Sequence, residues 1–554
     1  MEPVSYYFEK LSNFSERTLS PIFIAIITLV VYMLLISSTS SKTARGPPSL
    51  SDPIPFVFNT LQYLFDNDRF SARARRALQN VNVVKFHLGL KPVYIASGHQ
   101  NVQAMFSSSE LSYEDLFVRH AFPKFWKMSG EVKRFADDQS GQGKTPLANA
   151  TLPSDGQRYW APRHHIHSEF LSRPQNFKPV IDAFAKQFSA ALETHPLGEW
   201  NTLSVRDLCR QVVTESAIDA LFGPNMLTLN PGFVDAFWEF DAVFMKLILG
   251  LPAWVDPRPF RAHDRYLSMI GKHLDVAFNN FDWDGPEMEW EPRFGARVCR
   301  ELVKWLHEAG FRREALSGAL GALLFAQNTN SIPAATWMIT ELVKDAGMLQ
   351  AVREEVATAY VATVSEPGTA RTLDTHKLVT LPLLQSIFAE TLRLRMNLNI
   401  IRNLKNPLVL DGFEIPEGSM LQTSTVMAHY DEWVWGTPEH PATAFWAERH
   451  VKYIRDGEGE SQSCSRRVFD MSRRPSHFFP FGGGSPICPG RNLAKAEIFT
   501  MVALIVDRFD IEFVRWTKLD GTSSDRPAAN DVRYSAAGVV PPDRDMVIRW
   551  KRMW

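Results

Sequence analysis

The residues best suited to chemistry lie in one short stretch, FFPFGGGSPICPGRNL, residues 478–493. Its spacing is Phe481-x-x-Gly484-x-x-x-Cys488-x-Gly490, and an apolar helix is expected to begin near Gly490. Glycines allow the backbone to lie close to a flat ligand. A Cys488 thiolate would be stabilised by backbone N–H groups and by the positive end of that helix, as a metal-ligating thiolate requires. A glycine-rich turn around an inert cysteine is the simpler alternative, but the full spacing favours a metal ligand.

A polar group interrupts a long apolar stretch, 313–344, which is expected to form a helix through the core. The interruption reads AQNTNSIP over residues 326–333. Because proline has no N–H, Pro333 leaves the carbonyl oxygen of Thr329 without its helical donor, and that oxygen could bind a water molecule or a substrate. A polar patch that only bends the helix is the simpler alternative.

Glu390 and Arg393 are three residues apart, so a helix over 382–395 would place both on one face, where they can form an ion pair. Arg449 could offer a second planar guanidinium to the same carboxylate. In isolation, such charges more often form a solvated helix face.

The cysteine loop resembles the haem-binding loop of the cytochrome P-450 superfamily. Further motifs follow the order of that family: Glu390 to Arg393 resembles its Glu-x-x-Arg pair, 429–436 its strand-end segment and 445–449 its Pro-Glu-Arg-Phe region. The resemblance implies a mainly α-helical fold with small β-sheets and a bound haem b (iron protoporphyrin IX). It implies that Cys488 is the axial thiolate ligand of the iron. It also implies a structural role for the charged residues at 390, 393 and 449.

In this family, Phe481, Gly484 and Gly490 belong to the haem loop, and arginines bind the haem propionates. Arg402 lies where a propionate-binding arginine often follows the Glu-x-x-Arg helix. The segment 156–170 resembles the Trp-x-x-x-Arg element, in one of two registers, which pair Tyr159 with Arg163 or Trp160 with His164. A basic surface helix is the alternative. The family usually has Arg or His two residues before the cysteine; this chain has Pro486, so one propionate contact is lost or supplied from elsewhere.

Most monooxygenases of the family carry an acid followed by a threonine in the central helix, and this pair relays protons. Aligned from Ala326, the acid position becomes Asn328 and the alcohol Thr329. Aligned on Asn-(Ser/Thr)-Ile-Pro-Ala, the segment resembles the sterol 7-alpha-hydroxylase and prostacyclin synthase branch, and Asn330 takes the alcohol position. We prefer the second alignment and expect Asn330 and Thr329 to be the catalytic polar residues.

The elements that must position these residues are mostly helical. Shorter helices are expected at 347–360 and 382–395, after the long helix at 313–344. Brief apolar alternations over 400–430, broken by Asn-Pro, Asp-Gly and Pro-Glu-Gly turn signals, predict short strands beside the helices.

The start of the chain predicts a single membrane-spanning helix. The run 21–36 has Thr28 as its only clearly polar residue, and uncharged serines extend it. A cleaved signal peptide is the alternative. Lys42 and Arg45 after the run favour a cytosolic body. We expect a tail at 1–20, an anchor at 21–41, a proline-rich hinge at 42–58 and a haem-thiolate catalytic domain at 59–554, on the cytosolic face of the endoplasmic reticulum membrane.

Composition excludes several classes of protein. The 554 residues include 60 Lys and Arg against 61 Asp and Glu, so a nucleic-acid binder driven by bulk charge is not expected. Four scattered cysteines form neither a disulfide framework nor a paired-cysteine zinc site.

The resemblance implies a monooxygenase that oxidises a hydrophobic, steroid- or terpenoid-like substrate with O2. Its partners would be membrane lipid and an NADPH-cytochrome P-450 reductase, through which NADPH supplies electrons. One alternative is a haem-thiolate isomerase or dehydratase that acts on an oxygenated lipid or terpenoid without O2 or reductase. Another is a non-catalytic haem protein that carries or senses a ligand.

Overall fold

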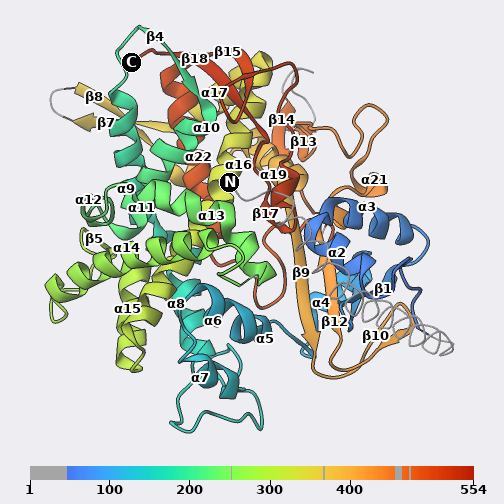
Figure 1. Cartoon of the computed structure of the whole chain (residues 1–554). Coiled ribbons are helices and arrows are strands. Elements are labelled where there is room, and N and C mark those ends of the chain that lie inside the picture. The colour runs from blue at the N-terminus through green and yellow to red at the C-terminus, as the bar shows by residue number, and fades with distance from the viewer. Residues whose placement is uncertain (1–45, 251, 366–367, 456–464, 473, 475) are drawn as a thin grey trace, which may run out of the picture. The chain divides into compact units, whose positions relative to one another are not determined.

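The structure is a computed structural model that describes residues 46–250, 252–365, 368–455, 465–472, 474 and 476–554. It divides into two compact units. The first contains the described residues up to Ser112 together with Ile400–Thr423, and the second contains Tyr113–Asn399 and Ser424–Trp554. The expected fold class, mainly helical with small sheets, is confirmed (Figure 1).

The predicted tail and membrane anchor, 1–41, lie outside the described residues. Among the helices of the described part, none combines the length and the apolar character needed to cross a bilayer.

The first unit is built around a small sheet. Strand β1 pairs antiparallel with β2, and β2 pairs parallel with β12. Leu50, in the described part of the predicted hinge, donates its N–H to the Lys85 carbonyl on β1 (2.7 Å). The elements of this unit are α2 (Phe58–Phe65), α3 (Asn67–Ala77), β1 (Val83–Leu88), β2 (Lys91–Ala96), α4 (His99–Ser107), β3 (Leu111–Ser112), β10 (Leu408–Leu410), β11 (Phe413–Ile415) and β12 (Met420–Ser424).

Helices dominate the second unit. They are α5 (Glu114–Leu116), η1 (Phe117–Ala121), α6 (Phe122–Phe125), α7 (Val132–Asp137), α8 (Trp160–Ser172), α9 (Pro174–Glu193), α10 (Val205–Asp207), η2 (Leu208–Val213), α11 (Thr214–Phe222), α12 (Asn225–Leu229), α13 (Phe233–Leu249), α14 (Arg258–Asn280), α15 (Arg297–Glu308), α16 (Arg313–Lys344), α17 (Ala346–Ala357), α18 (Thr375–Leu378), α19 (Pro382–Arg395), α20 (Thr425–His429), α21 (Glu432–Trp435), α22 (Arg491–Arg508) and η3 (Val532–Tyr534).

The strands of the second unit form a four-stranded sheet and several hairpins, and strand β9 begins in this unit and continues into the first at Ile400. The sheet has the order β16-β15-β18-β4, and β17 pairs antiparallel with the first residues of β9. The strands are β4 (Trp200–Ser204), β5 (Trp290–Glu291), β6 (Gly295–Ala296), β7 (Tyr360–Ser365), β8 (Gly368–Leu373), β9 (Met396–Leu404), β13 (Val451–Arg455), β14 (Ser465–Phe469), β15 (Phe509–Lys518), β16 (Ser523–Ser524), β17 (Ala537–Val539) and β18 (Arg544–Arg552).

The helix predicted at 313–344 is confirmed as α16, which packs against α22, α14 and α19 (Figure 1). Its close packing depends on small residues, since a Cβ on Gly318 would overlap the carbonyl oxygen of Trp126. The helix predicted at 382–395 is confirmed as α19. The helix predicted at 347–360 ends earlier, at Ala357, because the chain turns there into strand β7.

The expected ion pairs around Glu390 are present and fully buried. Arg393 Nε and Arg449 Nε each donate to the Glu390 carboxylate at 2.8 Å, and all three side chains have 0% exposure. Burial by itself raises the pKa of Glu390, but hydrogen bonds from Arg393 and His450, together with the nearby guanidinium charges, lower that pKa to about 2. The group is therefore an ionised carboxylate in the folded protein.

Replacing Glu390 with Gln should destabilise the protein by about 3–5 kcal/mol, because two buried guanidinium groups would lose their counter-charge. Urea denaturation at neutral pH measures this change. The matched control is Glu512→Gln, which breaks an exposed ion pair with Arg549 and should cost less than about 1 kcal/mol. Equal small losses in both variants would contradict the structural role of Glu390.

Because its pKa is lowered, Glu390 makes the free energy of unfolding depend on pH. Its stabilising contribution is fully present above the ordinary carboxyl pKa of 4.5 and is lost as the pH falls towards 2.

Candidate functional site

The cysteine loop is closed by its own backbone. The Cys488 N–H donates to the Phe481 carbonyl oxygen at 3.0 Å, and the Gly482 N–H donates to that of Phe479, also at 3.0 Å. Gly482 and Gly484 adopt left-handed φ angles of 75° and 73°, which residues with a Cβ rarely adopt. Two glycines of the loop, of which Gly484 belongs to the motif, are therefore required by its shape.

The Cys488 sulfur lies directly before α22, whose cap residue is Gly490, as the sequence predicts. Burial raises the pKa of the thiol, while the N–H groups of Gly490 and Arg491 and the Arg491 charge act in the opposite direction. The stabilisation expected for a thiolate is thus present but is outweighed by desolvation. A metal cation on the sulfur would supply the missing positive charge.

Helix α8 lies against the cysteine loop. Ser172 donates its hydroxyl to the Pro489 carbonyl at 2.9 Å, and Asn492 donates its amide to the Ser172 carbonyl at 3.0 Å. His164 forms a hydrogen bond with the backbone of Ser485. The helix that carries the predicted propionate ligand therefore shares contacts with the loop that carries the cysteine.

Arg163 on α8 is a cation in an aromatic surrounding. Its guanidinium carbon lies 5.1 Å from the ring centroid of Phe117 and 5.8 Å from that of Phe122. Burial lowers the pKa of Arg163, and within the described part of the chain no carboxylate forms an ion pair with it. A desolvated guanidinium of this kind suits a bound carboxylate such as a haem propionate.

The two aromatic residues before Arg163 bind other groups. The Trp160 indole N–H donates to the Phe135 carbonyl at 2.9 Å, and the Tyr159 hydroxyl donates to Asp155 at 2.5 Å. Both aromatic residues therefore have protein partners, and the role of Arg163 at a haem propionate stays a prediction.

Arg402, the second predicted propionate ligand, lies on β9 within the first unit. Its Nη1 donates to the Ile401 carbonyl at 2.9 Å. Its role at the haem stays a prediction.

One face of α16 carries small side chains that the rest of the fold leaves partly uncovered. Ala326 is exposed in the middle of this otherwise largely buried helix, and Ala319 and Ala322 on the preceding turns are partly exposed. The spacing i, i+3, i+7 places these small side chains on one side of the helix. An apolar face without bulky side chains, in the unit that holds Cys488 and Arg163, fits a haem.

The predicted catalytic pair lies next to this face. The Asn330 side-chain oxygen accepts the N–H of Val539 on β17 at 2.9 Å, and its amide donates to the Thr329 hydroxyl at 3.4 Å. Thr329 in turn donates to the Phe325 carbonyl at 2.9 Å. A Cβ on Gly538 would overlap the Asn330 amide, so glycine allows β17 to approach α16 this closely.

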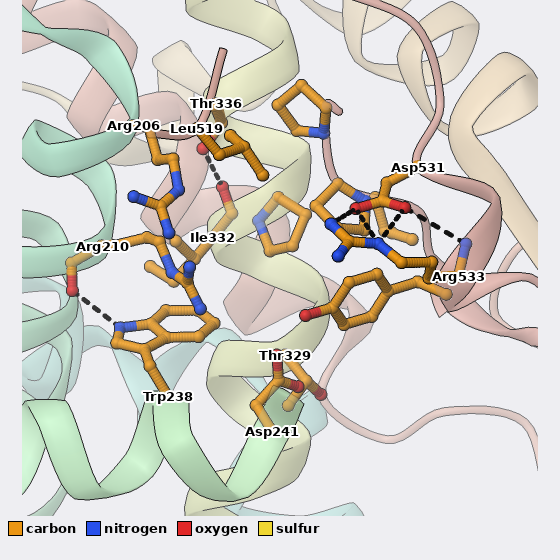
Figure 2. A pocket seen from close by; sticks show the side chains of 15 residues that line it. Arg206, Arg210, Trp238, Asp241, Thr329, Ile332, Thr336, Leu519, Asp531 and Arg533 are labelled. Atoms are coloured by element: carbon orange, nitrogen blue, oxygen red, sulfur yellow. Dashed lines mark hydrogen bonds and ion pairs between the residues drawn. The ribbon is translucent and has the colours of Figure 1, made fainter. Parts of the chain in front are cut away.

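A cavity of about 70 Å³ lies on a neighbouring side of α16 (Figure 2). Thr329, Ile332, Pro333 and Thr336 of α16 line it, and polar side chains from α10, η2, α13 and the segment 531–534 complete it. We call this space the polar cavity. Its other lining residues are Arg206, Arg210, Trp238, Asp241, Leu519, Asp531, Arg533, Tyr534, Val539, Pro541 and Pro542.

The sequence analysis missed the charged residues of the polar cavity. Arg210, Asp241 and Tyr534 are separated by tens to hundreds of residues and lie in no short motif. The sequence signal that points to them is indirect: the central helix has no acid at the position where most of the family carries one, so a proton donor would have to come from another element.

Comparison with known proteins gives consistent relatives. The family model described as Cytochrome P450 matches residues 47–523. The cytochrome P450 monooxygenase calL of Penicillium decumbens is 38% identical over 95% of this chain and 96% of that protein. The cytochrome P450 monooxygenase fsoE of Humicola fuscoatra is 28% identical over 92% of this chain and 88% of that protein. The cholesterol 7-alpha-monooxygenase of Cricetulus griseus is 25% identical over 64% of this chain and 66% of that protein.

Replacing Cys488 with Ala or His should abolish the thiolate-type carbon monoxide difference spectrum of the reduced, haem-containing protein, because the sulfur ligand would be lost. The matched control is Cys299→Ala, since Cys299 is a buried thiol whose Sγ lies 3.2 Å from the Leu221 carbonyl oxygen. The control should keep the spectrum. Survival of the spectrum in the Cys488 variants would show that another residue ligates the iron.

Proposed function

The chain belongs to the cytochrome P450 family of monooxygenases, and from this we propose that it inserts one oxygen atom from O2 into a hydrophobic, steroid- or terpenoid-like substrate. The observation that carries the proposal is the combination of the Cys488 loop with the small-residue face of α16 in one compact unit. The loop offers a thiolate ligand to iron, and the helix face leaves space beside it.

The proposed substrate class has two supports. One relative is named a cholesterol 7-alpha-monooxygenase, and it matches about two thirds of this chain. The segment Asn330-Ser-Ile-Pro333 carries the pattern on which the sequence resembles sterol hydroxylases. A rigid, apolar polycycle would also suit a site bounded by small apolar side chains such as Ala322 and Ala326.

Haem b, when bound, supplies the oxygen chemistry. In the proposed mechanism, Cys488 would hold the iron and donate electron density to it. Arg163 would bind a propionate and so fix the orientation of the ring. Thr329 and Asn330 hold water and a hydrogen-bonded path on α16, where Pro333 also frees a carbonyl oxygen. An amide such as Asn330 can only donate and accept hydrogen bonds, so the protons must come from another group.

The proposed setting of this reaction is the cytosolic face of the endoplasmic reticulum. The tail at 1–20, the anchor at 21–41 and the hinge at 42–58 would hold the catalytic domain, 59–554, at the membrane. Membrane lipid would present the apolar substrate, and an NADPH-cytochrome P-450 reductase would deliver the electrons.

The function is tested with the haem-containing protein, the reductase, NADPH and a panel of sterols, terpenoids and fatty acids. A substrate-induced change of the haem spectrum identifies ligands. Turnover under isotopically labelled dioxygen should then give a product that carries one labelled oxygen atom, and omission of NADPH should stop the reaction.

Other outcomes separate the alternatives. Unlabelled product formed at the same rate without NADPH or reductase would assign the chain to isomerases or dehydratases. Ligand binding with no turnover of any panel member would favour a haem protein that only carries or senses its ligand.

The anchor is tested by washing membranes from cells that produce the full chain with alkaline carbonate. The protein should stay in the pellet, and a variant that lacks 1–41 should enter the supernatant, because the apolar run would be missing. Protease added outside sealed microsomes should digest the body. Protection of the body would contradict the cytosolic orientation.

A further inference from the structure

Oxygen activation consumes protons, yet the central helix provides no acid at the positions where the family carries one. Asn328 and Asn330 are amides, and Thr329 is an alcohol. Amides and alcohols cannot hold a proton in reserve near neutral pH. Another group close to α16 must do so if the proposed function is right.

The polar cavity contains a suitable group, Asp241 of α13 (Figure 2). Among the described residues, none forms a hydrogen bond or ion pair with its carboxyl group. Asp241 is partly exposed and lines the cavity. A carboxyl group without a protein partner, directed into a polar cavity, is expected to bind water.

Arg210 of η2 brings a positive charge to the cavity near Asp241. The Arg210 guanidinium carbon lies 4.1 Å from the ring centroid of Trp238, whose indole N–H donates to the Arg210 carbonyl at 2.8 Å (Figure 2). The Arg210 guanidinium itself has no ion pair within the described part of the chain. Arg206 lies beside it and pairs with Asp207 at 3.5 Å. The stacked arginine is therefore held in place by an aromatic ring rather than by a carboxylate.

The segment 531–534 links the cavity to solvent. Arg533 is exposed and forms an ion pair with the buried Asp531 at 2.6 Å. Tyr534 lines the cavity, and both burial and the charge of Asp241 raise the pKa of its hydroxyl. The cavity thus lies between a solvent-exposed loop and the Thr329 side of α16.

The cavity is large enough for several water molecules, since a volume of about 10–15 Å³ holds one. The Thr329 hydroxyl donates to the Phe325 carbonyl and accepts from Asn330. Its oxygen can still accept from a cavity water. Rotation of the hydroxyl away from Phe325 would then release its own proton.

We propose that Asp241, through water in the polar cavity, supplies protons to the Thr329 hydroxyl and so replaces the acid that α16 lacks at the position where most of the family carries one. This inference rests on the proposed monooxygenase function. Each proton that leaves Asp241 towards Thr329 is replaced by one that enters from solvent past Arg533 and Tyr534, so the cavity keeps its charge. Asp241 therefore does not contact the substrate: it passes protons through cavity water to the Thr329 hydroxyl.

The environment of Asp241 suits this role. Burial raises its pKa to about 7, and the positive charge of Arg210 acts in the opposite direction. Arg206, Arg210, Asp531, Arg533 and Tyr534 are the other charged and titratable groups that line the cavity. A group with a pKa near the working pH can both give and regain a proton.

The raised pKa also has a cost in stability, with a defined sign. The contribution of the raised Asp241 pKa to the free energy of unfolding is fully present below the ordinary carboxyl pKa of 3.8 and is lost as the pH rises towards 7. The variant Asp241→Asn cannot ionise and should therefore be at least as stable as the wild type at pH values above 7.

The experiment compares Asp241→Asn, Asp241→Glu and a control from the same helix, the exposed Asp235→Asn, all loaded with haem. Product formed per NADPH consumed should fall by about tenfold in Asp241→Asn, with more peroxide released, since cavity water alone donates protons poorly. Asp241→Glu should restore most of the yield, and Asp235→Asn should match the wild type. In the wild type, but not in Asp241→Asn, the yield should fall as the pH rises through about 7.

A readout independent of turnover is the infrared band of protonated carboxyl groups in the substrate-free protein. The wild type should show one carboxyl band near pH 7 that is missing in Asp241→Asn, whereas the bands of Glu497 and Asp219, whose pKa values burial raises to about 7 and about 6, should remain in both proteins. The carbon monoxide spectrum should stay unchanged. Unchanged coupling in Asp241→Asn, or an effect on substrate affinity alone, would overturn the proton role and leave the monooxygenase proposal intact. A wild type with no NADPH-dependent product would overturn both.

Discussion

The buried carboxylate of Glu390 is the contact on which the cysteine side of the second unit depends. It binds Arg393, which also donates to the His429 carbonyl at 2.6 Å. Burial and the Arg393 charge lower the pKa of His429 to about 3, so the ring is neutral and its Nε2 accepts the N–H of Phe479 at 3.2 Å. Phe479 begins the loop that carries Cys488. One ionised group is thus connected by a short series of hydrogen bonds to the loop that carries Cys488, the predicted metal ligand, and this connection gives the costly buried charge a structural role.

Helix α16 serves two sides with different chemistry. The side that carries Ala322 and Ala326 has small apolar groups and suits a flat cofactor, whereas the side with Thr329 and Thr336 borders the polar cavity. Asn330 lies between them, and its bond to Val539 ties the helix to β17. The helix can therefore exclude water on one side and hold it on the other, and a proton has only to cross the width of the helix.

The sequence determined those features that depend on neighbours along the chain. The bounds of α16 and α19 follow from apolar periodicity and from Pro382 in the first turn of α19. The shape of the cysteine loop follows from glycines that adopt left-handed angles, so Cys488 could be predicted as a metal ligand from the loop sequence without any tertiary contact. The pairing of Glu390 with Arg393 is also local, because a separation of three residues fixes it on a helix.

Only the tertiary structure decided which polar groups meet. The sequence left two registers open around Arg163, and the packing of α8 buries this guanidinium among aromatic rings and places the Trp160 indole against the Phe135 carbonyl, contacts that no spacing along the chain encodes. It also expected a stabilised thiolate at Cys488, whereas burial, a property of the whole fold, keeps the thiol pKa raised. Asp241 and Arg210 come together from distant elements, and no spacing along the chain encodes their meeting. A sequence motif predicts contacts between residues that are close along the chain. Desolvation and contacts between distant residues arise only when the chain is folded and packed.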